Sequence, residues 1–192
     1  MRRTNSERTE TMRAALIAAA RGLFIEKGYA ETTTPDIVET AGVTRGALYH
    51  HFEDKKALFA AVITDEARKV SEEIETASAA SATARDALLA GTSAYFDAMA
   101  VPGRTRLLLL DGPAVLGSTA MRQVDEEYSE ASLKAGLKEL FAASDKASDL
   151  LDAFTDLLAA AFDRAALAIG AGGNREDYER AIAALIDGIS VK

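Results

Sequence analysis

The use of alanine and proline constrains the fold of this chain most strongly. Alanine supplies 40 of the 192 residues, whereas only three prolines occur. Alanine is the best helix former because it loses no side-chain entropy, and proline disrupts helices. Stretches rich in Val, Ile, Thr and aromatic residues, which would indicate strands, are nearly absent. We therefore predict an all-α protein.

Apolar spacing and capping signals divide the chain into about nine helices. The predicted ranges are 9–27, 35–41, 44–51, 54–77, 84–100, 105–110, 113–143, 145–169 and 174–189, with a break near Gly117 left open. The small-residue stretch 76–84 marks the predicted domain boundary. The result is an N-terminal domain over 1–55, a connecting helix over 54–77 and a C-terminal domain over 78–192.

Charge is unevenly distributed along the chain. The whole sequence carries a net charge of −8, which by itself argues against nucleic acid as a partner. Residues 1–60 hold 9 Lys or Arg and 8 Asp or Glu, for a net charge of +1, whereas residues 61–192 hold 13 and 22, for a net charge of −9. The N-terminal third is therefore the part of the chain that a polyanion would bind.

Several protein classes are excluded by what the sequence lacks. Without cysteine, the chain cannot form a disulfide scaffold, a zinc ribbon or a catalytic thiol. Its apolar runs, such as Leu107–Leu110, are too short to span a membrane. The first ten residues, MRRTNSERTE, carry no apolar segment typical of a signal peptide. We expect a soluble cytoplasmic protein.

Two short helices joined by a glycine-containing turn predict a helix-turn-helix motif. Threonine followed by Pro35 and Asp36 is a strong helix start, and Gly42 ends that helix. Thr44 then caps the second helix, whose Leu48 and the following Phe52 face inward. In this motif the second helix lies in the major groove of DNA, and its first residues meet base edges.

The outward residues of the second helix fit this role. Arg45 can donate two hydrogen bonds to a guanine edge. Gly46 and Ala47 are small enough for close approach, and Ala47 can contact a thymine methyl. Tyr49 and His50 follow on the outer surface, where they can donate to phosphates.

Lys55 occupies an unusual position at the start of the helix predicted over 54–77. A lysine in the first turn opposes the helix dipole, at a cost of roughly 0.3–1 kcal/mol. A phosphate at that helix N-terminus would be attracted by both the dipole and the ammonium group. We therefore predict that Lys55 binds a DNA phosphate.

The stretch TTTPDIVETAGVTRGALYHHFEDKKALFAAV resembles the DNA-binding domain of the TetR family of bacterial transcription regulators. The resemblance covers about the first third of the chain and implies a helix-turn-helix domain followed by a helical ligand-binding and dimerisation domain. It places DNA contacts at Thr33, Thr34, Thr44, Arg45, Gly46, Ala47, Tyr49, His50, His51 and Lys55. Pro35 stands where some members carry a basic residue that contacts a base, so the operator would be read mostly by the second helix.

The resemblance also implies a homodimer built on the last two helices. The helix predicted over 145–169 is apolar on two faces, so one face needs a partner. The predicted dimer interface comprises Leu150, Leu157, Ala161, Tyr178, Ile182, Leu185 and Ile189. Two copies would present their recognition helices about 34–36 Å apart on a palindromic operator.

A small-molecule inducer is the third implied partner, in a cavity among the middle helices. Candidate lining residues are Tyr95, Phe96, Met99, Arg106, Leu108, Asp111, Tyr128, Leu137, Phe141, Phe154, Leu158 and Phe162. Most are apolar, so we expect a largely apolar ligand that shifts the 54–77 helix like a lever and releases the operator. The protein would then be a ligand-released repressor, and DNA and ligand would oppose each other reciprocally.

The residue types also bear on metal binding and catalysis. His50 and His51 are neighbours on a helix and point about 100° apart, so they cannot chelate one metal ion. The carboxylates Asp145, Asp149, Asp152 and Asp156 lie on one stripe, which we interpret as a solvated face. No Ser-His-Asp set, phosphate loop or redox motif is present, so we expect no enzyme activity, metal or cofactor. A regulator of the same fold without an inducer and a helical enzyme or adaptor remain as alternatives.

Overall fold

The computed structural model describes residues 5–144 and 148–190, and these residues are helical with no strand among them. The all-α prediction is therefore confirmed for the described chain. The chain divides into two compact units. The first, called the head, contains the residues up to 65 together with 106–118; the second, called the body, contains 66–105 and the residues from 119 onward.

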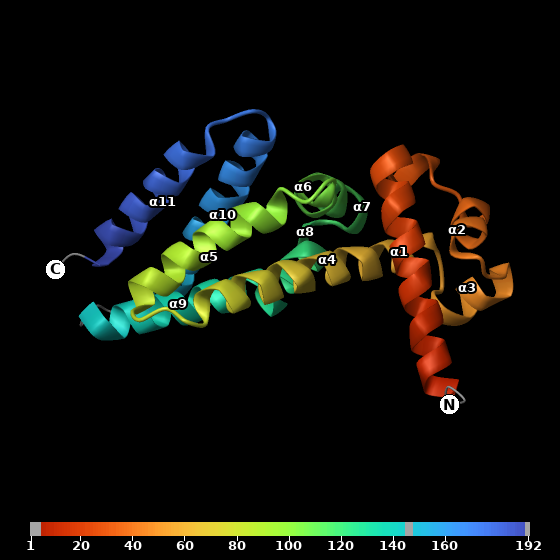
Figure 1. Ribbon diagram of the computed structural model, residues 1–192, viewed down its shortest axis with the longest axis horizontal. Helices are drawn as coiled ribbons and strands as arrows, with labels where there is room; N and C mark the ends of the chain where they lie inside the picture. Colours follow the sequence, from red (N-terminus) through yellow and green to blue (C-terminus); the bar gives the residue numbers. More distant parts are fainter. Residues whose placement is uncertain (1–4, 145–147, 191–192) are drawn as a thin grey trace. The chain divides into compact units, whose positions relative to one another are not determined.

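The N-terminal part of the head, up to residue 65, consists of three helices and the beginning of a fourth (Figure 1). The helix α1 spans Asn5–Glu31 and is interrupted by non-helical Gly28, while α2 spans Thr34–Ala41 and α3 spans Arg45–His51. The long helix α4 spans Lys55–Ser78; its residues up to Asp65 belong to the head, and those from Glu66 onward belong to the body. These bounds agree closely with the predicted ranges, although α1 extends beyond both predicted ends.

Aromatic rings organise the core of the head. Phe24 and Phe59 are fully buried with ring centroids 5.0 Å apart, and Tyr29 lies 5.0 Å from Phe59. Leu48 of α3 is 1% exposed and Ile37 of α2 is fully buried. Burying side chains of this size stabilises each contact by about 1.5–3 kcal/mol relative to exposure. The two short helices are thus held by their inward faces, which leaves their outward faces for a partner.

The segment after α5 departs from the predicted pattern. A three-residue helix α6, Arg104–Arg106, runs into a π-helical turn, Leu107–Asp111, where a single α-helix was predicted over 105–110. Next come α7, Gly112–Leu116, and α8, Ser118–Glu127. Residues 106–118 belong to the head rather than to the predicted C-terminal domain.

The body contains the remaining helices. The helix α5 spans Ala84–Met99, α9 spans Ser129–Ser144, α10 spans Leu151–Gly170 after a short 3-10 turn at Ser148–Leu150, and α11 spans Arg175–Ser190. Figure 1 shows α10 and α11 as a hairpin near the C-terminus. Tyr95 and Phe96 of α5 pack against Phe162 of α10, with centroids 5.5 and 6.1 Å from its ring. These contacts form an aromatic centre for the body.

The segment predicted as a helix over 113–143 contains three helices. The break near Gly117 that the prediction left open is present, whereas the second break was not predicted. Gly117 adopts φ 89°, a conformation that L side chains rarely adopt, and this ends α7. A second break falls at Tyr128, whose backbone N–H still bonds to the carbonyls of Val124 and Asp125. The predicted helix start at Asp145 lies outside the described residues. Within the described residues no helix is both long and apolar enough to cross a membrane.

Candidate nucleic-acid interface

The helix α2 begins with a reciprocal cap. Thr33 is the N-cap: its hydroxyl accepts from the backbone N–H of Asp36 (3.3 Å), and the Asp36 carboxylate accepts from the N–H of Thr33 (3.2 Å). These bonds to Thr33, with the ammonium of Lys27 nearby, lower the pKa of Asp36. The sequence predicted the threonine N-cap one residue later, directly before the proline, so that Asp36 would be the second helical residue. The reciprocal cap requires Asp36 to be the third helical residue.

The turn between α2 and α3 depends on a left-handed glycine. Gly42 has φ 66° and ψ 32°, and its N–H bonds to the carbonyls of Val38 and Glu39. Thr44 then caps α3, as predicted, since its hydroxyl accepts from the N–H of Ala47 (3.2 Å). A left-handed residue is tolerated best as glycine, so Gly42 fixes where the second helix starts.

The outward surface of α3 carries the predicted base-contacting residues. Arg45, Gly46 and His50 are exposed, and Tyr49 is 45% exposed. The Arg45 guanidinium lies 5.5 Å from the centroid of the Tyr49 ring. Hydrogen bonding to the phenol by Arg45 and by Thr34 of α2 lowers the pKa of Tyr49. The structure thus brings three predicted contact residues, from two helices, into one polar cluster.

Lys55 has a different environment from the one that its position predicted. Its ammonium donates to the carbonyls of Tyr29 (2.8 Å) and Thr32 (2.9 Å), with a longer contact to Ala30 (3.4 Å). It also lies 4.3 Å from the centre of the Tyr29 ring. A cation at helix-terminal carbonyls complements the dipole of α1. Lys55 therefore caps α1, and a contact with DNA phosphate stays a prediction that these bonds do not support.

Two head residues were missed by the sequence reasoning. Thr32, the first of three threonines, is fully buried and donates from its hydroxyl to the carbonyl of Gly28 (2.7 Å). Arg13 of α1 stacks 5.3 Å from the ring of Phe52 and adds a cation beside the end of α3. Arg13 could have been identified from the sequence, because it follows the apolar Met12 and lies on the polar side of α1.

The residues predicted to line a ligand pocket divide between the two units. Arg106, Leu108 and Asp111 belong to the head, where Arg106 and Asp111 form an ion pair at 3.1 Å. The body holds the other nine, of which seven are buried and Tyr128 and Phe154 are half-buried. Tyr95 donates from its hydroxyl to Asp163 at 2.7 Å, a polar contact that the sequence reasoning did not identify.

A groove of about 460 Å³ opens on another part of the body. None of the residues that line it was among the sequence-predicted pocket residues. The lining consists of Lys69, Glu72, Glu73, Thr76, Ala77, Ala94 and Asp97.

The residues predicted for the dimer interface separate into exposed and buried sets. Leu150, Leu157 and Leu185 are large apolar side chains that are 51%, 67% and 50% exposed. Ala161, Tyr178 and Ile189 are half-buried. Ile182 is 3% exposed and packs inside its own subunit, so it does not lie on the exposed stripe where it was predicted.

The fold and this surface define a helix-turn-helix protein with a separate helical unit. The sequence model for bacterial regulatory proteins of the tetR family matches residues 16–62, and that for the tetracyclin repressor-like C-terminal domain matches residues 85–190, more than half of the chain. The chain therefore belongs to the TetR family.

Curated relatives match part of the chain. The HTH-type transcriptional repressor BepR of Brucella suis is 49% identical over 74 residues, which cover 38% of this chain and 34% of the relative. The HTH-type transcriptional regulator TtgR of Pseudomonas putida is 51% identical over 63 residues, 33% and 30% of the two chains. The match thus spans about a third of the length of these curated relatives.

Solved structures match nearly the whole chain. A TetR-family transcriptional regulator from Pectobacterium atrosepticum is 30% identical with a TM-score of 0.74, and the match covers 99% of both chains. The regulator FadR from Bacillus subtilis, in complex with stearoyl-CoA, has a TM-score of 0.75 at 18% identity over 93% of this chain and 99% of that chain. The second match shows the fold alone.

Proposed function

We propose that this chain is a DNA-binding transcription regulator that reads a palindromic operator as a homodimer. The observation that carries the proposal is the cluster formed by exposed Arg45 and Tyr49 on the capped helix α3 and half-buried Thr34 of α2. Arginine is suited to bidentate recognition of guanine, and threonine and tyrosine hydroxyls can donate to phosphates.

The dimer is supported by the exposed face of α10 and α11. Leu157 and Leu185 would each remove large apolar area from water on association, worth about 25 cal/mol per Å². Exposed Ala160, Ala181 and Gly188 on the same two helices are small enough to let a second pair of helices approach closely. A second copy of the chain is the proposed occupant of this face, because the same apolar patch on both copies is self-complementary under two-fold symmetry.

Release by a small molecule is the second part of the proposal. Support comes from the aromatic centre of the body, where Tyr95 offers one polar anchor among apolar rings. Such an arrangement suits a largely apolar ligand held by a few polar groups. The FadR neighbour, with its bound stearoyl-CoA, is an example in this fold of a ligand that carries a long apolar chain.

The dimer is tested by placing a carboxylate on its proposed interface. Leu157→Glu should convert the dimer to monomers in light scattering and weaken binding to a duplex selected from random sequence by more than about 100-fold, because a single head makes half of the contacts. Leu110→Glu is the matched control, since Leu110 is 52% exposed and belongs to the head rather than to α10 or α11. Equal effects of the two substitutions would contradict the assigned interface.

Selection of a binding site from random-sequence duplexes tests whether the protein recognises a DNA sequence. A folded wild-type dimer that enriches no sequence and retards no duplex at low salt would overturn the proposal and favour the helical enzyme or adaptor. Thermal shift with stearoyl-CoA and with a free long-chain fatty acid tests for a ligand of this class. A shift accompanied by loss of operator binding supports release, whereas an unchanged melting temperature favours a regulator that lacks an inducer of this kind.

A further inference from the structure

Contacts between a cation and an aromatic ring occur at three places among the described residues of the head. In two of them the ring, that of Phe52 or Tyr29, is buried or half-buried. In the third, Arg45 and Tyr49 are both exposed on the outward surface of α3. This third pair therefore contributes little to the core of the head, and its geometry bears on what the surface binds.

The side chains of Arg45 and Tyr49 lie on the same face of α3, because they are four residues apart. The guanidinium carbon is 5.5 Å from the ring centroid, within the distance of about 6 Å at which an aromatic ring attracts a cation. A hydrogen bond from the guanidinium to the phenol oxygen accompanies this contact and lowers the pKa of Tyr49. The tyrosine thus restricts the positions that the arginine side chain can take.

Tyr49 is itself held from the neighbouring helix. The hydroxyl of Thr34, the first residue of α2, donates to the same phenol oxygen. Thr34 is half-buried and β-branched, so its side chain has few rotamers and its hydroxyl has a nearly fixed position. The contacts therefore run from α2 through the tyrosine to the arginine at the start of α3.

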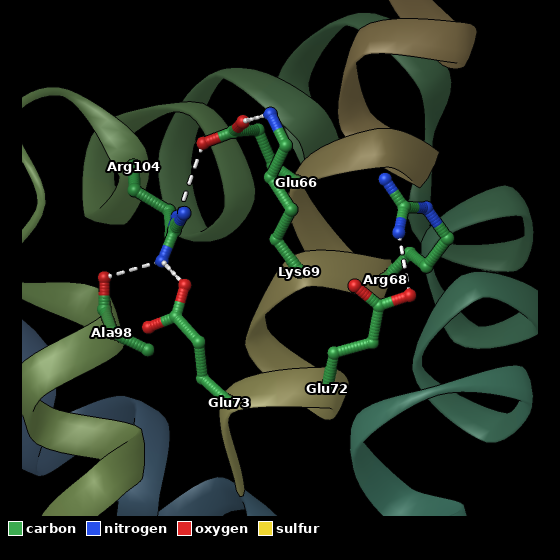
Figure 2. A network of polar contacts seen from close by, with 7 residues as sticks. All are labelled: Glu66, Arg68, Lys69, Glu72, Glu73, Ala98 and Arg104. Carbon is green, nitrogen blue, oxygen red and sulfur yellow. Dashed lines mark hydrogen bonds and ion pairs between the residues drawn. The ribbon is translucent and has the colours of Figure 1, made fainter. Parts of the chain in front are cut away.

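Arg104 of the body is an example of an arginine that is engaged within the protein. Figure 2 shows its guanidinium bonded to the carboxylates of Glu66 and Glu73 and to the carbonyl of Ala98. By contrast, Arg45 forms no ion pair with any residue in the described part of the chain. A guanidinium has several N–H donors, so contact with one phenol leaves Arg45 able to donate a pair of hydrogen bonds to guanine.

We propose that Tyr49 is a positioning residue that determines sequence specificity, because it holds the Arg45 guanidinium in place for a guanine while Thr34 holds its hydroxyl. The inference rests on the proposed function, in which Arg45 reads a base. An arginine loses side-chain entropy when it binds, and one that is already held loses less. Tyr49 therefore acts on the preference at the base pair that Arg45 reads. A tyrosine that only donated to a phosphate would act on all sequences equally.

The first measurement uses the full chain without DNA. Nuclear magnetic resonance of the Arg45 Nε–Hε group, assigned by the loss of its signal in Arg45→Lys, gives the order parameter of this side chain. We expect a value above about 0.6 in the wild type and a fall of at least about twofold in Tyr49→Leu, which removes both the ring and the hydroxyl. Tyr49→Phe keeps the ring and should give an intermediate value. Tyr49 is 45% exposed, so both variants should fold.

The matched control is His50→Leu. His50 is the next residue on α3, is also exposed and is also a predicted phosphate contact, but it points about 100° away from Tyr49. This substitution should leave the order parameter of Arg45 unchanged. Thr34→Val removes the hydroxyl at nearly constant shape and should lower the order parameter less than Tyr49→Leu does.

DNA binding supplies the second measurement. On the selected operator and its variants, Tyr49→Leu should reduce the preference at the base pair read by Arg45 about tenfold and leave the preferences elsewhere as in the wild type. In an Arg45→Ala background the same substitution should reduce that preference no further, because the two residues act as a unit. His50→Leu should weaken binding to every duplex by the same factor.

Two results would overturn the proposal. One is an order parameter of Arg45 that is unchanged in Tyr49→Leu. The other is an equal loss of affinity on every duplex, which would assign Tyr49 to a phosphate contact alone. If the wild type enriches no sequence, the proposed function fails, but the order parameters still decide whether Tyr49 holds Arg45.

Discussion

The head and the body differ in how their polar contacts are built. The caps of the head join residues three positions apart: Thr33 with Asp36, and Thr44 with Ala47. The body has a cap of the same kind at Thr83 and Asp86, but it also has polar contacts between distant segments. Arg104 is bonded to Glu66 38 positions away, and Tyr95 to Asp163 68 positions away. Short-range contacts leave a pattern in sequence, whereas long-range contacts depend on how the helices pack.

The comparisons with known proteins differ in how much of the chain they cover. Matches at about 50% identity are confined to about a third of the chain, although a structure with a TM-score of 0.74 matches it almost completely. A surface that reads DNA constrains individual side chains, while a helical unit that binds a ligand can keep its packing with many sequences. The fold is accordingly shared by chains that are 30% identical.

Lys55 is an exception to the short-range contacts of the head, since its contacts with Tyr29 and Thr32 span 26 and 23 positions. We expect Lys55→Met to lower the free energy of unfolding of the head by about 2 kcal/mol, because three carbonyls lose a charged donor. Urea denaturation and amide exchange of residues 28–32 measure this loss. Lys56→Met, at the next and exposed position, is the control and should change little.

DNA binding by the same variant separates its two interpretations. If Lys55 caps α1, the slope of log affinity against log salt stays as in the wild type. A phosphate contact would reduce that slope by about one unit when the lysine is removed. A reduced slope with unchanged stability would contradict the capping role.

In the body, the environment of Asp125 provides a further test of the difference between the two units. Burial, with the nearby carboxylates of Asp163 and Glu130 and against the opposing effect of Arg122, raises the pKa of Asp125 to about 6. Its folded-state pKa thus exceeds the unfolded value of about 4, so the folded protein binds this proton more tightly. The contribution of Asp125 to the free energy of unfolding is greatest below about pH 4 and is lost as the pH rises through about 6.

Asp125→Asn should therefore stabilise the body at pH 7.5 by about 1 kcal/mol, after allowance for screening by solvent at a partly exposed group. It should also flatten the change in stability between about pH 4 and pH 6. Thermal melts across this range provide the measurement, with exposed Asp149→Asn as the control. A parallel pH profile for Asp125→Asn and wild type would contradict the assignment.

Much of the head was predictable because its signals are local. Pro35, Gly42 and Thr44 mark the ends of the two short helices, and the structure places them there. The sequence reasoning missed the acceptors of Lys55, because a helix dipole argument considers only the helix on which the lysine lies. The carbonyls at the end of α1 come from a different part of the chain.

The body was predictable only in outline. Glu66 of α4 is 1% exposed, a degree of burial that the sequence alone did not indicate. A carboxylate at a buried position requires a cation, but nothing in the spacing identifies Arg104, 38 positions away. Likewise, Ile182 fits the apolar stripe predicted for the dimer but packs within its own subunit, because α11 has apolar positions on more than one side.

The most direct test of DNA reading by α3 compares wild type and Arg45→Ala on an operator and on each of its single-base-pair variants, at one salt concentration. We expect Arg45→Ala to lose about 1–3 kcal/mol of discrimination at one base pair in each half-site and to keep the wild-type preference at the others. Unchanged affinity and base preference, or equal weakening on every duplex, would contradict the account.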